Sequence, residues 1–290
     1  MAYQRAAGKS RHRPRKRFGQ HFLADEHIAD RIVEAAGLTA DDTVLEIGPG
    51  KGVLTGRLLE KARLVYAVEI DRDLARSLRE RFAENAGFRL VEADILRLDL
   101  SELFGDDTGP VRVVSNIPYN ISKPIIELLV RSRDIVTDAV LMVQLEVAKR
   151  LLAKPGSKDY GLSTLNLALF AEGEKLMNVR PGSFRPPPAV MSGVISLSFS
   201  KTCRYSLADV GVFYRLTGAA FRQRRKMVRN TLIPYIMSLG IDRGDADDLI
   251  TSARIDPRSR PEDIDIYGFV RLSNSLVKVR PGIASSEGNP

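Results

Sequence analysis

The stretch TVLEIGPGKG, from Thr43 to Gly52, decides the expected fold. Its first five residues, Thr43–Ile47, form a short apolar run that predicts a buried strand. The three glycines that follow let the backbone turn sharply and approach a ligand closely, and the apolar residues after Gly52 predict that a helix begins there. The stretch therefore predicts a strand, a glycine turn and a helix, which is how many α/β sheets begin.

Short apolar runs and helical patterns alternate on both sides of this stretch. The other predicted strands are Leu64–Glu69, Phe88–Glu92, Val111–Ser115, Ala139–Val143 and Ser192–Phe199. The predicted helices are Asp25–Ala36, Val53–Lys61, Asp71–Ala86, Lys123–Arg131 and Leu145–Ala153. Because the strands are rich in Val, Ile and Leu and alternate with helices, we expect a parallel, Rossmann-like α/β sheet with helices on both faces.

The pattern becomes purely helical after about residue 200. Predicted helices there are Phe213–Leu232, Asp245–Ala253 and Asp263–Val277. The sequence thus predicts a small C-terminal α-helical domain after the sheet domain. The expected organisation is a basic N-terminal arm at residues 1–17, a sheet domain at 18–203, a helical domain at 204–279 and a tail at 280–290.

Acidic residues end the second and third predicted strands. Glu69 lies 17 residues after Gly52, where a carboxylate can accept hydrogen bonds from two ribose hydroxyls. Asp94 can accept a hydrogen bond from an adenine amino group, or can simply cap a turn. Val53 stands where the dinucleotide fingerprint GxGxxG has its last glycine, so the observed GxGxG favours a methyl-donor nucleoside over a nicotinamide dinucleotide.

The sequence Asn116-Ile117-Pro118-Tyr119 follows the fourth predicted strand. The amide oxygen of Asn116 and the carbonyl oxygen of Pro118 can each accept an N–H from a purine amino group. Such bonds localise the nitrogen lone pair, and Tyr119 offers a face for the base, worth about 1–3 kcal/mol. Because an amide is no base, we expect direct in-line transfer that depends on positioning and hydrogen bonds, without a metal. The alternative is a plain Asn-x-Pro turn.

The composition favours a polyanionic partner. The chain has 290 residues, a formal net charge of +8 and a pI near 9.6, a balance typical of nucleic-acid-binding proteins.

No apolar run approaches the length of a membrane span. The single cysteine, Cys203, excludes an internal disulfide and fits a reducing compartment, so we expect a cytoplasmic location. The three histidines lack metal-ligand spacing, and we expect no metal site.

Positive charge is concentrated in two segments. Residues 1–24 contain seven Lys or Arg side chains, and they form a solvated tail, an arm along phosphates or a transit peptide. The second segment, Phe221–Asn230, carries five basic residues: Arg222, Arg224, Arg225, Lys226 and Arg229. It is either a solvated helix face or a surface that contacts phosphates, and together with a base-binding site it predicts RNA binding.

These motifs carry a family resemblance. From about Lys16 to Val279 the chain resembles the KsgA (RsmA) family of small-subunit ribosomal RNA adenine dimethyltransferases. The matching pieces are RFGQHFL, EIGPGKG, VEID, EAD, NIPYNIS, QLEVAKRL, PGSKDYGLS, SFRPPPAV and FRQRRKMVRN, in this order. The resemblance implies a class I methyltransferase sheet with a small helical domain.

The resemblance also implies the activity and the site. We expect S-adenosylmethionine-dependent dimethylation of N6 on two adjacent adenines, in the loop of the 3′-terminal helix of small-subunit (16S) rRNA. The expected partner is this rRNA or a pre-30S particle, and the chain is expected to be monomeric. Seven residues are implied to contact the methyl donor: His21, Leu23, Gly48, Gly50, Glu69, Asp94 and Asn116. Phe184 is implied to stack on the target base opposite Tyr119.

Two residues depart from the family pattern, and three other functions stay open. His21 stands where bacterial members usually have asparagine, and Met191 replaces the usual acid after the PPPxV motif.

The alternative functions are a large-subunit rRNA adenine methyltransferase of the macrolide-resistance type, a non-catalytic RNA-binding assembly factor and a nicotinamide-dependent oxidoreductase. Asn120 and the PGSKDYGLS segment favour the small-subunit family, and the intact Asn116–Tyr119 loop argues for catalysis.

Overall fold

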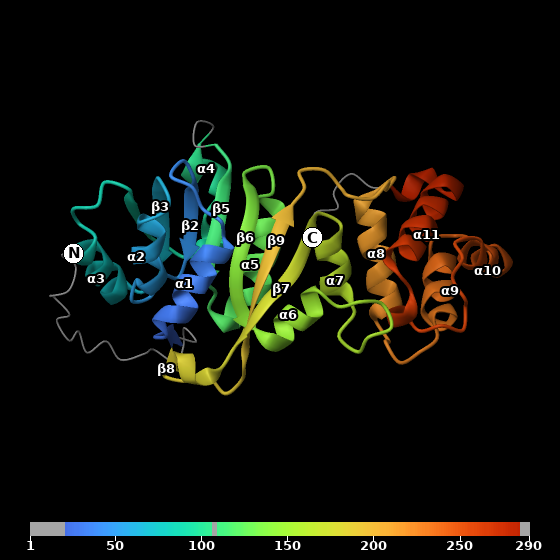
Figure 1. Cartoon of the computed structure of the whole chain (residues 1–290). Helices are drawn as coiled ribbons and strands as arrows, with labels where there is room; N and C mark the ends of the chain where they lie inside the picture. Colours follow the sequence, from blue (N-terminus) through green and yellow to red (C-terminus); the bar gives the residue numbers. More distant parts are fainter. Residues whose placement is uncertain (1–20, 106–108, 285–290) are drawn as a thin grey trace. The chain divides into compact units, whose positions relative to one another are not determined.

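The computed structural model describes residues 21–105 and 109–284 (Figure 1). The chain divides into two compact units. Unit 1 comprises Met1–Leu145 and Leu176–Ser196, and unit 2 comprises Glu146–Lys175 and Leu197–Pro290. The basic arm expected at residues 1–17 lies outside the described residues, and the domain limits expected from the sequence stay a prediction.

A seven-stranded sheet has the order β4-β3-β2-β5-β6-β9-β7. The strands are β2 (Thr43–Ile47), β3 (Leu64–Glu69), β4 (Phe88–Glu92), β5 (Val111–Asn116), β6 (Val136–Gln144), β7 (Ala171–Val179) and β9 (Ser192–Phe199). Parallel pairs join β2 to β3 and β5, β3 to β4, and β5 to β6. The expected parallel pairing is confirmed for β2 to β6. Strand β7 was not predicted. It lies at the edge of the sheet, and its exposed charged residues Glu172, Glu174 and Lys175 interrupt the apolar run that would indicate a strand.

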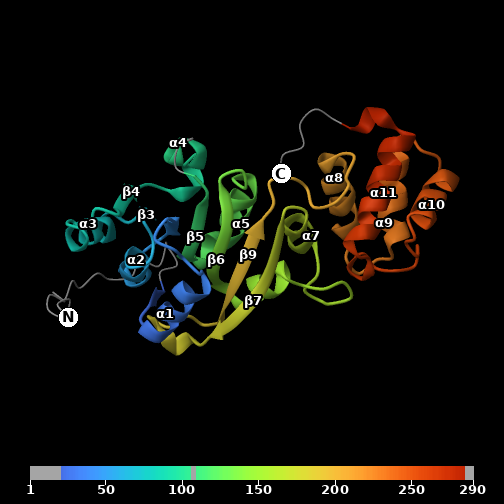
Figure 2. The ribbon, with the colours of Figure 1, turned by 45° about the horizontal axis from the view of Figure 1, so that its top comes forward.

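Helices lie on both faces of the sheet of unit 1. They are α1 (Glu26–Ala35), α2 (Val53–Leu59), α3 (Arg72–Arg81), α4 (Leu100–Phe104) and α5 (Ser122–Arg131). In Figure 2, α1 and α2 lie on one side of the strands and α4 and α5 on the other. Two aspartates begin helices as N-caps. Asp25 accepts a hydrogen bond from the Ile28 amide at 3.2 Å, and Asp71 accepts one from the Asp73 amide at 3.0 Å.

Burial follows from the parallel pairing. Every residue of β2 is buried, as expected for a central strand that is covered by helices on both faces. A small antiparallel pair, β1 (Phe22–Leu23) with β8 (Phe184–Arg185), adds a second layer against this core. Leu23 and Phe184 belong to a core cluster with Ala29 and Ile32 of α1. The segment before α1 is therefore held at the sheet by its own buried side chains.

Unit 2 contains α6 (Leu145–Leu151) except its first residue, together with α7 (Leu162–Ala168), α8 (Val210–Phe221), α9 (Val228–Ser238), α10 (Arg243–Ser252) and α11 (Ile266–Val279). Helix α8 packs against α7, α9 and α11, and α10 packs against α9 and α11. The rings of Phe221 and Phe269 are 6.1 Å apart at the centre of this packing. Within the described residues, none of the helices is long and apolar enough to cross a bilayer.

The single long helix predicted at Phe213–Leu232 is wrong. Helix α8 ends at Phe221, and the chain turns before α9 begins at Val228. The amides of Val228 and Arg229 donate to the carbonyl oxygens of Ser259 and Pro257, at 2.8 and 3.1 Å. These tertiary hydrogen bonds replace the bonds that a continuous helix would make, so packing overrides a sequence of good helix formers.

Gly52 gives a direct test of the fold. Its φ is +73°, and an added Cβ would lie 2.8 Å from Cδ2 of Leu78. We expect Gly52→Ala to lower the free energy of unfolding by about 1–3 kcal/mol, because alanine is strained there and collides with α3. Chemical denaturation measures the change.

Gly56→Ala is the matched control for this substitution. Gly56 lies inside α2, and the nearest atom to an added Cβ is 3.9 Å away. Alanine there should leave stability unchanged or raise it by up to about 1 kcal/mol, because alanine favours helix. Equal stability of the Gly52→Ala variant and the wild type would contradict the assigned turn.

Candidate active site

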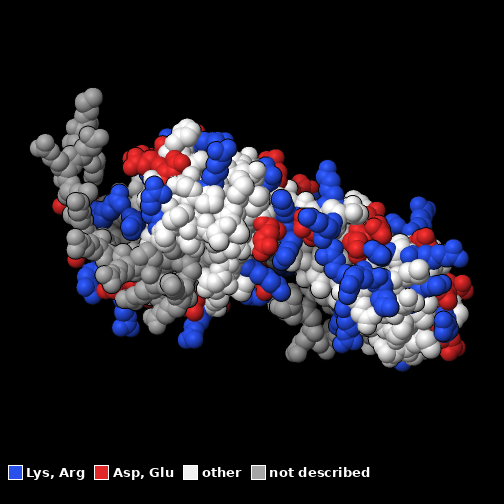
Figure 3. Space-filling view, turned by 90° about the horizontal axis from the view of Figure 1, so that it is seen from below, with Lys and Arg blue, Asp and Glu red and all other residues white. Residues whose placement is uncertain are grey.

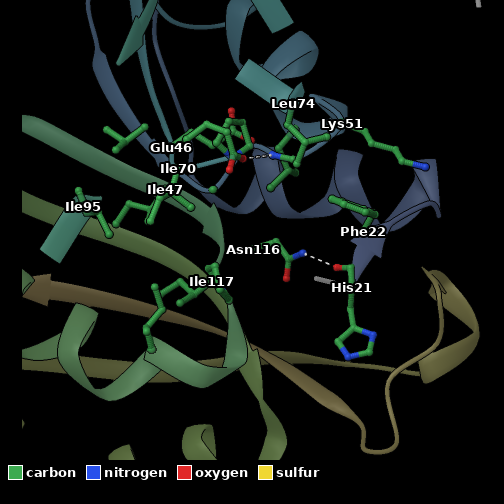
Figure 4. Close-up of a pocket in the computed structure, with 18 of the residues that line it drawn as sticks. His21, Phe22, Glu46, Ile47, Lys51, Ile70, Leu74, Ile95, Asn116 and Ile117 are labelled. Atoms are coloured by element: carbon green, nitrogen blue, oxygen red, sulfur yellow. Dashed lines mark hydrogen bonds between the residues drawn. The ribbon is translucent and has the colours of Figure 1, made fainter. Parts of the chain in front are cut away.

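A cavity of about 190 Å³ lies in unit 1, where β2, β3 and β5 end (Figure 4). Carboxyl ends of parallel strands are where open α/β sheets bind ligands. All seven residues implied to contact the methyl donor line this cavity: His21, Leu23, Gly48, Gly50, Glu69, Asp94 and Asn116. Pro118 and Tyr119 line it as well. The structure therefore brings together residues that are spread over almost 100 positions of the sequence.

The glycine turn leaves space at the floor of the cavity. Gly50 has a φ of +59°, and a Cβ on it would lie 2.9 Å from Cδ1 of Phe22. A side chain at this position would be strained and would push the aromatic ring aside. The Phe22 ring also faces the ammonium group of Lys51, 5.1 Å from the ring centre. Glycine at position 50 thus permits the close packing of β1 on the turn.

Glu69 is held rigidly at the end of β3. The residue is 4% exposed, and its two carboxylate oxygens accept hydrogen bonds from the amides of Gly50 and Asp71, at 3.1 and 2.9 Å. Burial raises the pKa of Glu69, and the two backbone hydrogen bonds oppose this effect. Each oxygen accepts only one of these bonds, so each keeps a lone pair for a hydroxyl in the cavity.

Asp94 caps a turn and also lines the cavity. Its Oδ1 accepts a hydrogen bond from the amide of Leu96 at 3.1 Å and so caps the short 3₁₀ helix η2 (Ile95–Arg97). Its Oδ2 lies 3.7 Å from the guanidinium of Arg97. The residue also lines the cavity, next to Ala93 and Ile95. Capping fixes the direction of the carboxylate, and ligand binding at Asp94 stays a prediction.

Glu46 is a cavity residue that the sequence analysis did not single out. It is 2% exposed, and Oγ1 of Thr55 donates a hydrogen bond to its carboxyl group at 2.6 Å. Burial raises the pKa of Glu46 to about 8, the hydrogen bond from Thr55 opposes this, and the charge of Glu69 adds to it. The sequence does contain a signal for Glu46, because this acidic residue lies near the end of the predicted strand, two residues before Gly48 of the glycine turn.

Asn116 presents a free acceptor. Its Nδ2 donates a hydrogen bond to the backbone carbonyl of His21 at 3.3 Å, which fixes the orientation of the amide (Figure 4). Its Oδ1 is buried and has no hydrogen-bond partner within residues 21–105 and 109–284. A buried polar atom without a partner is unfavourable, so this oxygen is suited to accept an N–H from a ligand.

The other predicted acceptor, the carbonyl of Pro118, already has partners. The amide of Ile121 donates to it at 3.2 Å in the 3₁₀ helix η4 (Tyr119–Ile121). Oγ of Ser122 lies 3.4 Å from this carbonyl and 3.2 Å from that of Tyr119. A hydroxyl has one proton to donate. When Ser122 donates it to the backbone carbonyl of Tyr119, the Pro118 oxygen accepts only from the amide of Ile121 and keeps its second lone pair for a ligand.

Tyr119 is fixed at both its ring and its hydroxyl. The hydroxyl lies 2.5 Å from Oγ of Ser192, and burial raises the pKa of Tyr119. The ring stacks on the imidazole of His21, with centroids 5.6 Å apart and planes at 27°. Nδ1 of His21 donates to the carbonyl of Pro186 at 3.0 Å. In Figure 4 the imidazole points away from Asn116, so only the backbone of His21 contacts that residue.

Phe184 does not line the cavity. It is 0% exposed and packs in the core cluster with Leu23, Ile32 and Val194. The pairing of β1 with β8 places Phe184 opposite Leu23, which is itself a core residue. In this structure the side chain of Phe184 stabilises the core, and its stacking on a target base opposite Tyr119 stays a prediction.

The predicted RNA-binding residues belong to unit 2, at the turn between α8 and α9. Figure 3 shows Lys and Arg side chains, with acidic ones between them, on one face of the C-terminal helices. Arg222, Arg225, Lys226 and Arg229 are exposed. Arg224 differs, because it donates to the carbonyl of Lys158 at 2.8 Å and lies 3.9 Å from the carboxylate of Glu262. Arg224 thus holds two loops of unit 2 together.

Among the described residues there is no group of three or more His, Cys, Asp or Glu side chains placed to hold a metal ion.

Comparison with known proteins assigns the family. The family described as "Ribosomal RNA adenine dimethylase" matches residues 11–275. The chain belongs to this family. A small-subunit relative, "Ribosomal RNA small subunit methyltransferase A" of Pseudomonas syringae pv. syringae, is 40% identical over 265 residues, 91% of this chain and 95% of the relative. The protein of the same name from Psychrobacter cryohalolentis is 38% identical over 277 residues, 93% of each chain.

Solved structures agree with this family membership. A dimethyladenosine transferase from Plasmodium falciparum superposes with a TM-score of 0.71 and 28% identity, covering 87% of this chain and 96% of that one. The 23S rRNA methyltransferase ErmE superposes with a TM-score of 0.68 and 26% sequence identity, covering 88% of this chain and 99% of that one. These similarities confirm the class I methyltransferase fold with its C-terminal helices.

Glu46→Gln tests the electrostatics of the cavity. The raised pKa means that the folded chain keeps a proton on Glu46 that the unfolded chain releases, between its ordinary value of 4.5 and about 8. The free energy of unfolding of the wild type therefore falls as pH rises through this window, by at most about 1.4 kcal/mol per pH unit from this group. Glutamine does not titrate, so the variant should gain stability relative to the wild type as pH rises.

Unfolding transitions recorded across this pH window measure the effect. Glu60→Gln removes an exposed carboxylate at the end of α2 and serves as the matched control. Its stability should run parallel to that of the wild type. If the free energy of unfolding of Glu46→Gln changed with pH in parallel with that of the wild type, the assignment of a protonated Glu46 would be wrong.

Proposed function

We propose that the chain uses S-adenosylmethionine to dimethylate N6 of two adjacent adenines in the loop of the 3′-terminal helix of small-subunit rRNA. The observation that carries the proposal is the buried Oδ1 of Asn116, which has no hydrogen-bond partner among the described residues and lies in the wall of the cavity that also holds Glu69. The family membership and the names of the relatives support the substrate class.

The residues of the cavity fit the proposed cofactor. Glu69 keeps a lone pair on each oxygen for the ribose hydroxyls, and Asp94 can accept a hydrogen bond from the adenine amino group. When bound, S-adenosylmethionine supplies an electrophilic methyl group on a positively charged sulfur. The carboxylate of Glu69 lowers the energy of a positive ligand in this buried site, while a protonated Glu46 adds no further negative charge.

Asn116, Pro118 and Tyr119 act on the target base. Oδ1 of Asn116 accepts one N6–H of adenine, and the remaining lone pair of the Pro118 carbonyl accepts the other. Both bonds draw the N6 lone pair away from the ring and toward the methyl group. The nitrogen forms the new N–C bond as the C–S bond breaks, and the extra proton on nitrogen passes to water. After the first transfer one N–H remains, so only one of the two acceptors can orient the second.

The wider setting follows from the same proposal. The target adenine must leave its stack to reach Asn116, and this costs least in an RNA loop whose bases are already splayed. We propose the rRNA or a pre-30S particle as partner, a cytoplasmic location and a monomeric state. The exposed side chains of Arg225, Lys226 and Arg229 then contact phosphates.

Methyl transfer from labelled S-adenosylmethionine to immature small subunits tests the proposal. We expect label on two adjacent adenines in the wild-type reaction. Asn116→Ala should lower kcat/KM by about 10²–10³-fold, the effect of removing one preorganised electrostatic contact. Asn178→Ala, at an exposed position on β7, is the matched control and should retain wild-type activity.

The other outcomes of this reaction identify the alternatives. Label on protein-free large-subunit rRNA, and none on small subunits, would assign the macrolide-resistance type of activity. Tight binding to small subunits without label on any adenine would assign a non-catalytic assembly factor. Full activity of the Asn116→Ala variant would overturn the role given to that side chain.

A second prediction concerns the turn between α8 and α9. Replacing Arg225 and Lys226 by Ala should weaken RNA binding and should flatten the slope of log K against log salt by about 0.7–0.9 for each phosphate that is no longer neutralised. Arg224 is left unchanged because it holds loops of unit 2 together. Replacing Arg243, an exposed arginine at the start of α10, should change the slope little. If the slope of the double variant equals that of the wild type, these side chains do not contact phosphates, and the turn is a solvated surface.

A further inference from the structure

A second cavity lies in unit 2, on its surface between α8 and α9. These two helices lie side by side in both ribbon views (Figures 1 and 2), and the cavity has a volume of about 430 Å³. One wall comes from the end of α8 and the turn after it, with Arg222 and Gln223. The other wall is one face of α9, where Asn230, Pro234 and Ser238 recur every four residues. We call this cavity the α8–α9 groove.

One end of the α8–α9 groove is positively charged. The guanidinium of Arg222 is exposed and makes no hydrogen bond or ion pair with any other described residue. Three more exposed basic side chains follow it in the turn and in the first residues of α9: Arg225, Lys226 and Arg229. Because Arg222 is paired with no acid of the described chain, an anionic group is favoured at this end.

Two side-chain amides without partners among the described residues line the groove together with Arg222. The side-chain amides of Gln223 and Asn230 are exposed and make no hydrogen bond within the described chain. Pro234 has no N–H, so the backbone carbonyl of Asn230, four residues earlier, lacks its helical donor. The groove therefore offers both donors and acceptors close to a cation, a combination that suits a sugar or the edge of a base.

The other end of the groove contains a fixed aromatic ring. Tyr235 is half-buried and hydrogen bonds to Arg215, whose guanidinium in turn donates to the carbonyl of Ile283 at 2.7 Å. The ring is thus held at its hydroxyl end and lines the groove. A ring that is already immobilised loses little conformational freedom when a flat ligand stacks on it.

We propose that the α8–α9 groove binds one unstacked nucleotide of the substrate RNA, other than the two adenines that are methylated. Its phosphate pairs with Arg222, its sugar and base edge contact the amides of Gln223 and Asn230, and its base lies against Tyr235. The volume of the groove is in the range of small-ligand pockets. The inference rests on the proposed function in one respect, because it takes RNA to be the partner.

RNA fits these features better than a free small anion. Proteins recognise unpaired RNA by stacking bases on aromatic rings and by hydrogen bonds to base edges and 2′-hydroxyls, while cations follow the phosphates. The groove places a cation, two amides and an aromatic ring beside a turn that offers further cations for the neighbouring phosphates. A free phosphate would use Arg222 and leave Tyr235 without a role.

The test measures binding of a short, fluorescent, single-stranded RNA that contains 4-thiouridine. Tyr235→Leu removes the ring, and Arg222→Gln removes the charge. We expect each to weaken binding roughly 10-fold, the effect of removing one stacked base or one phosphate contact. Tyr235→Phe keeps the ring and should bind like the wild type, which separates stacking from a general loss of structure. Arg243→Gln is the charge-matched control and should also bind like the wild type.

Cross-linking locates the nucleotide independently. Irradiation should attach 4-thiouridine to the α9 peptide that contains Tyr235, and a DNA of the same sequence should bind more weakly. Wild-type affinity of the Tyr235→Leu variant, or cross-links only at Arg225–Arg229, would overturn the proposal. If the wild type methylates rRNA while Tyr235→Leu changes nothing, the groove assignment alone fails. If the wild type methylates no rRNA, the proposed function fails, and the RNA-binding pattern still decides the groove.

Discussion

The parallel pairing of β2 with β3 and β5 determines where the polar groups of the cavity lie. Parallel strands end at the same edge of a sheet, and the residues that follow them must therefore meet there. Ile47 is paired with Val68, and Leu45 with Val113, so the glycine turn, Glu69 and Asn116 leave the sheet together. A change in the register of these strands would separate the groups, although each would still be present in the sequence.

Burial gives this edge its chemical character. Glu46 and Glu69 are both almost inaccessible, and each is hydrogen-bonded by a neighbour that limits its movement. Burial raises the pKa of both carboxyl groups, and it raises that of Glu46 to about 8. The same surroundings leave Oδ1 of Asn116 without a partner among the described residues. The site therefore holds a rigid set of acceptors that a positively charged nucleoside and a purine amino group can satisfy.

Much of this arrangement could be predicted from the sequence, for a physical reason. Strands β2 and β3 have the predicted bounds because central parallel strands are short, continuous apolar runs. The turn after Phe221 was not predicted and the burial of Phe184 was not foreseen, since both depend on tertiary contacts: the hydrogen bonds from Val228 and Arg229, and the pairing of β1 with β8. Neither contact leaves a local pattern that a single sequence reveals.

Direct binding of S-adenosylmethionine to the purified chain, measured by titration calorimetry, tests the central claim of a donor site at this sheet edge. One molecule should bind per chain, and Glu69→Ala should weaken binding strongly, because the ribose hydroxyls lose both acceptors. Arg222→Gln, far along the sequence in unit 2, should bind it as the wild type does. Absence of binding to the wild type, or equal affinity in the Glu69→Ala variant, would contradict a donor site at this edge.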